Sequence, residues 1–413
     1  MSDQFPDVEA TVPEITAAQL KARMDAGEHV VVLDTRRPAD YETWHIDGDT
    51  ITPINVPFTE FMDGNDPADG APDALVEALP DEYDEPMVTC CAKGLSSLYV
   101  AEFLSRESYE IVALDDGMRG WAGLYESREL PATFLPDGTT VHQFHRPSSG
   151  CLAYLVVSGA SRAAGQSSGG NPRDGAGEAM VVDPLRAFAS EYAAAAADDD
   201  AALVHAVDTH VHADHVSGVA TVADATDATA RVPEGARARG YEGDAAFVRD
   251  GDELAVGDVT VEALALPGHT SETLGFRVGD VLLTGDTVFT DSVARPDLEE
   301  GDDGAKEAAR QLYDTIQAID DLPGDVLVAP GHTSETAQPR ADGTYAATLA
   351  DLRERLPAFS RDRESFVNAI LDGMPPRPNN YQRIIAANLG KEQVSDSEAF
   401  ELELGPNNCA AGE

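Results

Sequence analysis

Three histidines and an aspartate are concentrated in the segment Thr209–Gly218, which reads T-H-V-H-A-D-H-V-S-G. These residues are His210, His212, Asp214 and His215. The chain contains ten histidines, so three in one short segment reflect a specific spacing and not a bias of composition. Imidazole and carboxylate groups at this density suit a divalent metal such as Zn or Fe. The segment therefore predicts a metal site, in preference to a polar loop with scattered histidines.

Strand ends are expected to position these residues. The apolar run 202–207 (A-L-V-H-A-V) predicts a buried strand that ends just before the histidines. Three later strand-like segments also end in a residue that can bind a metal, namely His269, Asp286 and His332. A single histidine after Pro-Gly is weak support, but four strand ends of this kind in one domain point to a shared site. The seven side chains could form a site for one metal ion or for two.

Cys91 has a setting that favours sulfur chemistry. Residues 86–91 (P-M-V-T-C-C) predict a strand, and the apolar stretch 98–104 predicts a helix soon after it. A cysteine in such a strand-to-helix loop lies beneath backbone N–H groups and a helix N-terminus, whose dipoles favour the thiolate. Arg36 and Lys93 could add positive charge. A loop of this kind can also hold a persulfide anion.

The composition limits the partners. The formal net charge is −47, from 28 Lys and Arg against 75 Asp and Glu, so the chain should repel nucleic acid and anionic membrane surfaces. The acidic residues are spread along segments with apolar periodicity, whereas a disordered tail would concentrate them. This pattern favours a folded, halophilic protein, because high salt screens the self-repulsion. The alternative is an ordinary acidic protein.

The same sequence favours a cytoplasmic protein. No apolar run approaches the roughly 20 residues of a membrane span, and the opening residues M-S-D-Q-F-P-D-V-E-A lack the basic and apolar regions of a secretion signal. The cysteines, Cys90, Cys91, Cys151 and Cys409, show no spacing typical of a disulfide framework. A reducing compartment is therefore expected. Cys409 is interpreted as an exposed terminal residue, with a mobile thiol near a site as the alternative.

Length and pattern predict two domains. At 413 residues the chain can form two or three. Residues 12–128 alternate short strands and helices, which predicts a parallel α/β sheet. Residues 129–140 contain prolines and a glycine and are expected to be a linker. Residues 141–390 would form the second domain and residues 391–413 a C-terminal tail.

Several motifs in residues 12–128 are shared with a known family. The motifs are Leu33–Arg36, His45 and Ile46 with Gly48, the loop Cys91–Ser96, and Gly117–Trp121. On these residues, the segment resembles the rhodanese (sulfurtransferase) family. The resemblance implies that Cys91, not Cys90, carries sulfane sulfur. It also implies that the sulfur substrate binds near Arg36, Lys93, Gly94 and Ser96, although many rhodaneses have Arg or Thr at the last of these positions.

Motifs in residues 141–390 also match a known family. They are T-H-V-H-A-D-H-V-S-G, P-G-H-T-S-E-T, L-T-G-D-T-V-F, A-R-P-D at residues 294–297, and the segment 375–381. On these motifs, the region resembles the metallo-β-lactamase superfamily and, within it, the persulfide dioxygenases. The resemblance implies an αβ/βα sandwich with the metal at the edge between its two sheets.

This second resemblance also implies roles for the candidate residues. One Fe(II) per chain would be held by His210, His269 and Asp286, because two histidines and a carboxylate leave open positions for O₂ and substrate. Arg295 would bind substrate. The remaining four would orient the ligands or hold a second metal, and they are His212, Asp214, His215 and His332. A homo-oligomer, a dimer or higher, is also implied.

The two resemblances together predict an enzyme of sulfane-sulfur metabolism. It would oxidise a low-molecular-weight thiol persulfide to sulfite with Fe(II) and O₂, while the rhodanese half moves sulfur to or from thiosulfate or sulfite through a Cys91 persulfide. Fusion of two domains that act on one sulfur atom raises its effective concentration. The alternative is a thioester hydrolase of the hydroxyacylglutathione hydrolase type, in which two Zn(II) ions bridged by Asp286 activate water. The rhodanese-like half could then be inactive, or could dock a partner.

Overall fold

The computed structural model describes residues 12–62, 70–159, 177–334 and 336–405. Within them, one compact unit is built mainly from residues up to Leu124, and a second unit begins at Tyr125. Cys409 lies outside the described residues, so the interpretation of its thiol stays a prediction.

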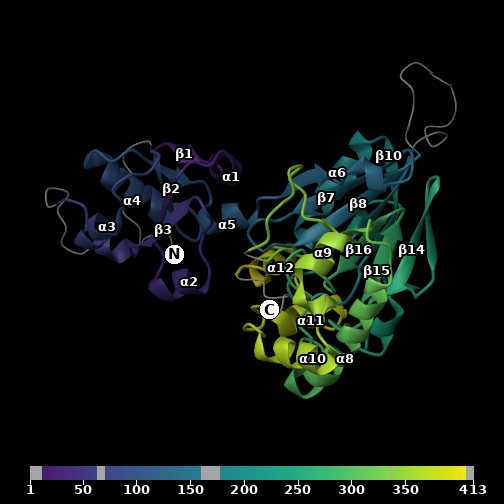
Figure 1. Ribbon diagram of the computed structural model, residues 1–413. Helices are drawn as coiled ribbons and strands as arrows, with labels where there is room; N and C mark the ends of the chain where they lie inside the picture. The colour runs from purple at the N-terminus through teal and green to yellow at the C-terminus, as the bar shows by residue number, and fades with distance from the viewer. Residues whose placement is uncertain (1–11, 63–69, 160–176, 335, 406–413) are drawn as a thin grey trace, which may run out of the picture. The chain divides into compact units, whose positions relative to one another are not determined.

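The first unit is a five-stranded parallel sheet with helices on both faces (Figure 1). In the order β1-β5-β4-β2-β3, its strands are β1 (Glu14–Ile15), β2 (Val30–Asp34), β3 (Ile51–Asn55), β4 (Met87–Cys90) and β5 (Ile111–Leu114). Its helices are α1 (Ala17–Asp25), α2 (Pro38–Thr43), α3 (Asp73–Ala78), α4 (Leu95–Arg106) and α5 (Gly117–Ala122). Strand β2 is buried throughout. Val31 and Leu33 pack with α4, and Val30 and Val32 pack on the opposite face, as strand alternation requires.

The second unit contains two mixed sheets, ordered β12-β11-β10-β9-β8-β7-β6 and β13-β14-β15-β16-β17-β18. The strands of the first are β6 (Glu126–Glu129), β7 (Thr139–His145), β8 (Leu152–Ser158), β9 (Gly177–Val182), β10 (Ala201–Val207), β11 (Thr229–Pro233) and β12 (Ala246–Val248). Those of the second are β13 (Glu253–Val256), β14 (Val259–Ala265), β15 (Leu274–Val278), β16 (Val281–Gly285), β17 (Leu327–Pro330) and β18 (Ala347–Thr348). The helices are α6 (Ala189–Asp198), α7 (Val219–Ala225), α8 (Gly301–Asp320), α9 (Leu349–Arg355), α10 (Arg363–Asp372), α11 (Tyr381–Asn388) and α12 (Asp396–Leu402).

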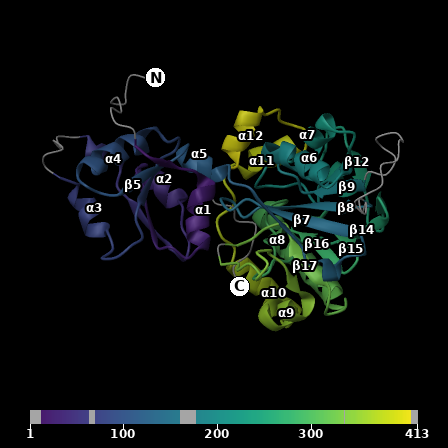
Figure 2. The same ribbon diagram turned by 90° about the horizontal axis from the view of Figure 1, so that it is seen from above.

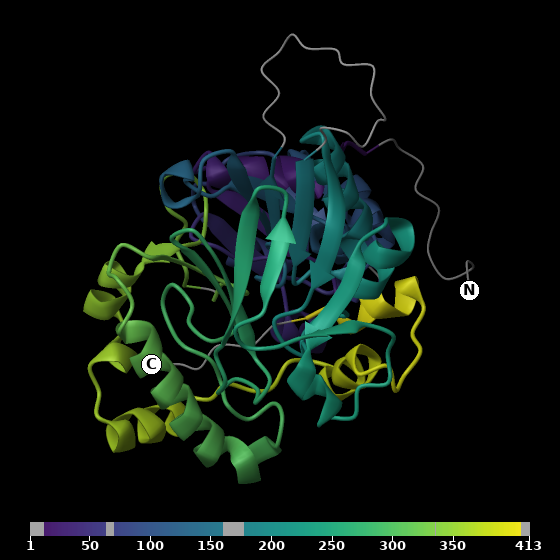
Figure 3. The same cartoon turned by 90° about the vertical axis from the view of Figure 1, so that its right-hand side faces the viewer.

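The two sheets of the second unit pack face to face and carry helices on their outer faces (Figures 2 and 3). Helices α6, α7, α11 and α12 lie on the side of the seven-stranded sheet, and α8, α9 and α10 on the side of the six-stranded sheet. Along β8, Tyr154 and Val156 enter the core between the sheets, whereas Leu155 and Val157 pack toward α6. These layers confirm the αβ/βα sandwich predicted for this part of the chain.

Strand direction brings the predicted ligand segments together within each sheet. Strands β9 and β10 are parallel, and β8 is antiparallel to β9, so β8 starts at the edge where β9 and β10 end. In the other sheet, β16 and β17 are parallel. Strand β14 runs the same way, because β15 is antiparallel to both of its neighbours. Each sheet therefore gathers the C-terminal ends of its parallel strands, the usual place for a binding site in such sheets.

The longest helix, α8, shows how the sequence fixes the outer layer. Its buried residues recur at spacings of three and four, for example Ala305, Ala309, Leu312 and Ile316. Asp302 and Asp303 lie in its first turn, where acidic groups stabilise a helix. The buried stripe packs against β17 and α10. No helix in the described part of the chain combines the length and the apolar character needed to cross a membrane.

The structure moves the predicted domain boundary toward the N-terminus. Within the expected linker 129–140, Leu130 is buried in the core between the two sheets and Ala132–Phe134 form a short 3-10 helix. The preceding strand β6 reads E-S-R-E and is mostly exposed, so it has no apolar pattern that could have revealed it. The expected tail 391–413 contains helix α12, which buries Leu402.

The turn before His269 packs so closely against α8 that only glycine fits at position 268. Gly268 has a φ of +138°, and a Cβ added there would lie 2.4 Å from Cα of Leu312. We predict that Gly268→Ala lowers the free energy of unfolding by more than about 3 kcal/mol, because it combines a disfavoured backbone conformation with overpacking. Denaturant unfolding in high salt, followed by circular dichroism, measures this change.

Gly251→Ala is the matched control. Gly251 also has a positive φ, +78°, but no heavy atom lies within 4 Å of an added Cβ. In this variant the free energy of unfolding should fall by only about 1–2 kcal/mol, the cost of the left-handed backbone conformation. Equal losses in the two variants would show that the contact with Leu312 is not what constrains the turn.

Candidate functional site

Three buried atoms converge where the two sheets of the second unit meet. Nε2 of His210 and Nε2 of His269 each lie 3.8 Å from Oδ2 of Asp286. All three side chains are at most 2% exposed, and none of these atoms has a hydrogen-bond partner among the described residues. Buried polar atoms are normally bonded, so the convergence fits a ligand that the three atoms share. One metal ion at ordinary ligand distances of about 2.0–2.2 Å could contact all of them.

The second ring nitrogen of each histidine is held by a hydrogen bond that fixes the tautomer. Nδ1 of His269 lies 2.9 Å from the carbonyl oxygen of Arg295, which can only accept, so this Nδ1 carries the proton. Nδ1 of His210 lies 2.9 Å from Oγ1 of Thr209. That hydroxyl donates its own proton to Asp183, so the His210 Nδ1 is also a donor. Both Nε2 atoms therefore direct a lone pair toward the site, as a metal ligand must.

Asp183 organises the segment that carries the histidines. It follows β9 with a left-handed φ of +52°, and it accepts hydrogen bonds from N and Oγ1 of Thr209 at 2.6 and 2.9 Å. Its Oδ1 also lies 3.1 Å from Nε2 of His212, and Oδ1 of Asp208 lies 3.6 Å from the same nitrogen. His212 therefore groups with these two carboxylates and not with the three converging atoms.

A third group lies next to Asp286. Nδ1 of His215 and Sγ of Cys151 lie 3.0 and 3.4 Å from Oδ2 of Asp214. His332 connects this group to the first, because its Nε2 lies 3.7 Å from Asp214 and its Nδ1 lies 3.6 Å from Asp286. An isolated β-bridge between the backbones of Cys151 and His332 fixes the cysteine in this position. The group has the composition of a second metal site, or of a set of side chains that supports the first.

Burial and neighbouring charges move the pKa values of these groups in different directions. Burial lowers the pKa of His210 well below its usual range and lowers the pKa of His269 as well. Burial would raise the pKa of Asp286, but the neighbouring imidazoles, His332 before the others, lower it. Burial would lower the pKa of His212, but the two carboxylates beside it raise that pKa well above its usual range. Neutral imidazoles beside an ionised carboxylate are the protonation states that bind a metal.

Arg295 lies behind the converging atoms. Its guanidinium donates to Asp297 at 2.7 and 3.0 Å and to the carbonyl oxygen of Pro376 at 2.8 Å. The side chain is 1% exposed, and the backbone carbonyl of the same residue accepts the hydrogen bond from His269. This placement favours a role in positioning His269 over the direct substrate contact expected from the sequence.

Sequence reasoning missed three residues that belong to these groups, which are Asp183, Asp208 and Cys151. Asp183 directly follows β9 and Asp208 directly follows β10. The strand-end argument that found the other candidates applies equally to both, so the sequence did contain a signal for them. Cys151 instead precedes a strand, and no spacing in the sequence connects it with Asp214.

Cys91 lies between β4 and α4 of the first unit. Its side chain is 4% exposed, and its Sγ lies 3.4 Å from Oγ of Ser97. The twelve-residue helix α4 begins in the same loop, so its N-terminal dipole favours an anion near Cys91. The preceding Cys90 packs into the core, where burial raises its pKa well above the ordinary value.

The other residues predicted for sulfur binding lie around this loop and differ in burial and in bonding. Gly94 adopts a φ of +81° at the start of α4, and Ser96 is half-buried in the first turn. Lys93 is exposed. The guanidinium of Arg36 is already paired with the buried Asp34, with Nη2 2.6 Å from Oδ2. Much of the positive charge expected from Arg36 is therefore engaged within the domain.

Comparison with known families and proteins covers both units. Residues 16–124 match the rhodanese-like domain, and residues 173–332 match the metallo-beta-lactamase superfamily. Persulfide dioxygenase ETHE1, mitochondrial, of Homo sapiens is 28% identical over 215 residues, which are 51% of this chain and 78% of that protein. Hydroxyacylglutathione hydrolase of Methylococcus capsulatus is 32% identical over 208 residues, which are 48% of this chain and 77% of that protein.

A solved structure shares the fold. The metallo-beta-lactamase from Staphylococcus aureus subsp. aureus COL superposes with a TM-score of 0.53 and is 26% identical, over 63% of this chain and 75% of that one. Taken with the site geometry and the two family matches, these relatives show that the chain belongs to the metallo-beta-lactamase superfamily and carries an N-terminal rhodanese-like domain.

Proposed function

We propose that the second unit oxidises a low-molecular-weight thiol persulfide with O₂, at one Fe(II) held by His210, His269 and Asp286. The overall reaction converts R-S-SH, O₂ and H₂O into R-SH, SO₃²⁻ and two protons. The observation that carries this proposal is the convergence of two histidine nitrogens and one carboxylate oxygen. Two histidines and one carboxylate are the ligand set of non-haem iron oxygenases. The named activity of the ETHE1 relative supports the same reaction.

The chain's own residues would prepare this site in three ways. Bound iron would supply the redox chemistry between O₂ and the persulfide. Thr209 and the carbonyl of Arg295 hold the two imidazoles in one tautomer and one orientation. The buried surroundings limit access of water to the reacting sulfur. Asp214 accepts a hydrogen bond from Nδ1 of His215 and so orients that imidazole beside the site.

The first unit would move sulfane sulfur through Cys91. Its thiolate attacks the outer sulfur of thiosulfate, the S–S bond of thiosulfate breaks, and sulfite leaves with the electron pair. A small thiolate then attacks the outer sulfur of the Cys91 persulfide, which forms R-S-S⁻ and restores the Cys91 thiolate. Neither step needs an added oxidant or reductant. The helix dipole at α4 supports the thiolate and persulfide anions in both steps.

A thioester hydrolase with two Zn(II) ions is the second candidate. The hydroxyacylglutathione hydrolase relative supports it, as does the group of Asp214, His215 and His332 next to Asp286. The position of His212 counts against it, since that imidazole is bonded to Asp183 instead of facing the converging atoms. The structure therefore favours one metal ion over two.

Metal content and O₂ uptake separate the two candidates. We predict about one Fe per chain after anaerobic purification in high salt, and O₂ uptake on addition of glutathione persulfide. His269→Ala should lose both the iron and the O₂ uptake. His215→Ala should keep its iron, because its nitrogen lies beside Asp214 and not among the three ligands. Two Zn per chain, with one lost in His215→Ala and no O₂ uptake, would contradict the dioxygenase, and hydrolysis of a glutathione thioester would then establish the hydrolase.

Asp183 should control the affinity for the metal. In Asp183→Asn, the amide cannot accept all three hydrogen bonds now made to Thr209 and His212. We predict that the affinity for Fe(II) falls about 10- to 100-fold, the range for lost support of a metal ligand, while activity per bound iron falls less. Asp199→Asn is the control, because Asp199 also pairs with a histidine, His142, but outside the site. The same loss in both variants would assign the effect to general destabilisation.

Cys91→Ser tests the first unit independently. We predict that this variant loses sulfur transfer from thiosulfate to a small thiol, since a hydroxyl cannot form the persulfide. Persulfide-dependent O₂ uptake should stay within about twofold of the wild type, because Cys91 lies outside the metal-binding unit. Cys90→Ser serves as the neighbouring control and should retain transfer wherever it folds. Wild-type protein without any thiosulfate activity would favour a docking role for this domain.

A further inference from the structure

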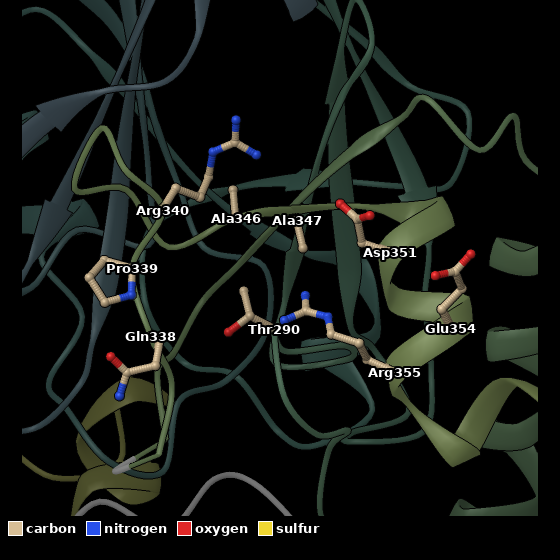
Figure 4. A pocket seen from close by; sticks show the side chains of 9 residues that line it. All are labelled: Thr290, Gln338, Pro339, Arg340, Ala346, Ala347, Asp351, Glu354 and Arg355. Carbon is tan, nitrogen blue, oxygen red and sulfur yellow. The ribbon is translucent and has the colours of Figure 1, made fainter.

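A cavity of about 450 Å³ opens beside the metal-binding unit's helix α9 (Figure 4). Charged and polar side chains dominate its walls, and the main ones are Thr290, Gln338, Arg340, Asp351, Glu354 and Arg355. Figure 4 shows the side chain of Arg355 extending from α9 toward Thr290. The volume is in the range of small-molecule sites, and neither the metal chemistry nor the sulfur transfer uses these side chains.

Arg355 is notable because it has no acidic partner in an acidic protein. Among the described residues, its exposed side chain makes no hydrogen bond, ion pair or ring contact, although the chain has 75 acidic residues and 28 basic ones. By contrast, Arg353, two residues earlier in the same helix, donates to Asp320 at 2.5 Å. A free guanidinium on a cavity wall is available to bind the carboxylate of a ligand in bidentate fashion.

Thr290 gives an independent indication of a ligand. Its side chain is only 6% exposed, yet its hydroxyl has no hydrogen-bond partner in the described part of the chain. The same residue lines the cavity. Because this hydroxyl is not engaged elsewhere among the described residues, it is available to donate to a bound molecule next to Arg355.

The charges of the wall define the class of ligand. Two arginines, Arg340 and Arg355, face the cavity together with two carboxylates, Asp351 and Glu354. A simple anion such as phosphate would meet the repulsion of both carboxylates. A molecule with separate carboxylate and ammonium groups can pair with both the arginines and the carboxylates of the wall. Amino acids and short peptides have this chemistry.

The cavity is also close to the metal ligands along the chain. Thr290 follows Asp286 by four residues, so their Cα atoms lie at most about 14 Å apart even in a fully extended chain. Asp291 accepts hydrogen bonds from Ser334 and from Oγ1 of Thr336, the latter at 2.8 Å. These hydrogen bonds tie the loop after Asp286 to the loop after His332. The cavity is therefore built on the same loops that follow Asp286 and His332.

We propose that this cavity binds a zwitterionic amino acid or short peptide, with its carboxylate on Arg355 and Thr290 and its ammonium group near Glu354. The ligand is either a free molecule of this class or the carrier end of the persulfide substrate. The second source rests on the proposed dioxygenase function, whereas the binding site itself does not.

Direct binding of S-methylglutathione tests the site without any turnover. This compound carries carboxylates and an ammonium group, but its blocked sulfur cannot act as a persulfide. Calorimetry in high salt should detect binding to the wild-type protein. Arg355→Gln should weaken it at least about tenfold, the cost of one charged hydrogen-bonded contact. Thr290→Val should weaken it less.

Two further variants separate recognition from helix stability. Arg355 ends α9, where any positive charge stabilises the helix dipole. Arg355→Lys keeps that charge but loses the planar fork, so it should weaken binding, though less than Arg355→Gln does, without a change in melting temperature. Arg310→Gln removes a surface arginine that pairs with Glu307 on α8 and should change neither property. Glu354→Gln should weaken binding of S-methylglutathione but not of glutarate, which lacks the ammonium group.

Some results would overturn the proposal. Absence of S-methylglutathione binding at millimolar concentration would do so, as would equal binding by wild type and Arg355→Gln. Inorganic phosphate that binds as tightly, and with the same dependence on Arg355, would show a plain anion site instead of a zwitterion site.

The kinetics of the same variants distinguish the two sources of ligand. If the cavity binds the carrier end of the substrate, Arg355→Gln raises KM for glutathione persulfide about tenfold and leaves kcat unchanged. If it binds a free amino acid or peptide, KM is unchanged while calorimetric binding is still lost. A wild-type protein with no O₂ uptake would refute the dioxygenase function, and the calorimetric result would still decide whether the site exists.

Discussion

The arrangement of the second unit depends on how the buried carboxylate of Asp286 is stabilised where the two sheets meet. An ionised carboxylate in a buried site is costly unless it is paired. Here the imidazoles of His210 and His269, each 3.8 Å from its Oδ2, are fixed so that their lone pairs, and not their protons, face it. Three electron-rich atoms at this separation repel one another, so a cation between them would offset the cost. The close packing of Gly268 on α8 and the burial of Arg295 hold this costly geometry in place.

The neighbouring carboxylates determine which histidines face the converging atoms and which are bonded elsewhere. Asp183 supports His210 through Thr209 and binds His212 directly. One side chain thus orients a ligand and also holds a second potential ligand away from the converging atoms. In this chain, carboxylates next to the histidines determine which imidazoles face the converging atoms.

The sequence predicts much of this site because strand ends and ligand residues follow one another directly. His210, His269, Asp286 and His332 each follow a strand within a few residues, and parallel strands bring such positions together without any further information. The sequence does not show how each side chain is oriented. His212 has the same spacing as a ligand, and only the folded positions of Asp183 and Asp208 show where its imidazole points. The sequence likewise predicts a substrate contact for Arg295 but does not show that its guanidinium is bonded to Asp297.

Burial also constrains how sulfur could pass between the two proposed activities. Cys91 is 4% exposed within its own loop, and the converging metal-site residues are at most 2% exposed within theirs. A persulfide formed on Cys91 would therefore be enclosed by its own loop, and in the proposed reaction a small thiol carries the sulfur away from it. With a net charge of −47, the protein repels a free anionic persulfide at low ionic strength. A carrier that also bears an ammonium group is repelled less, and high salt screens what remains. The surface charge and the mixed walls of the cavity near Arg355 thus favour the same kind of carrier.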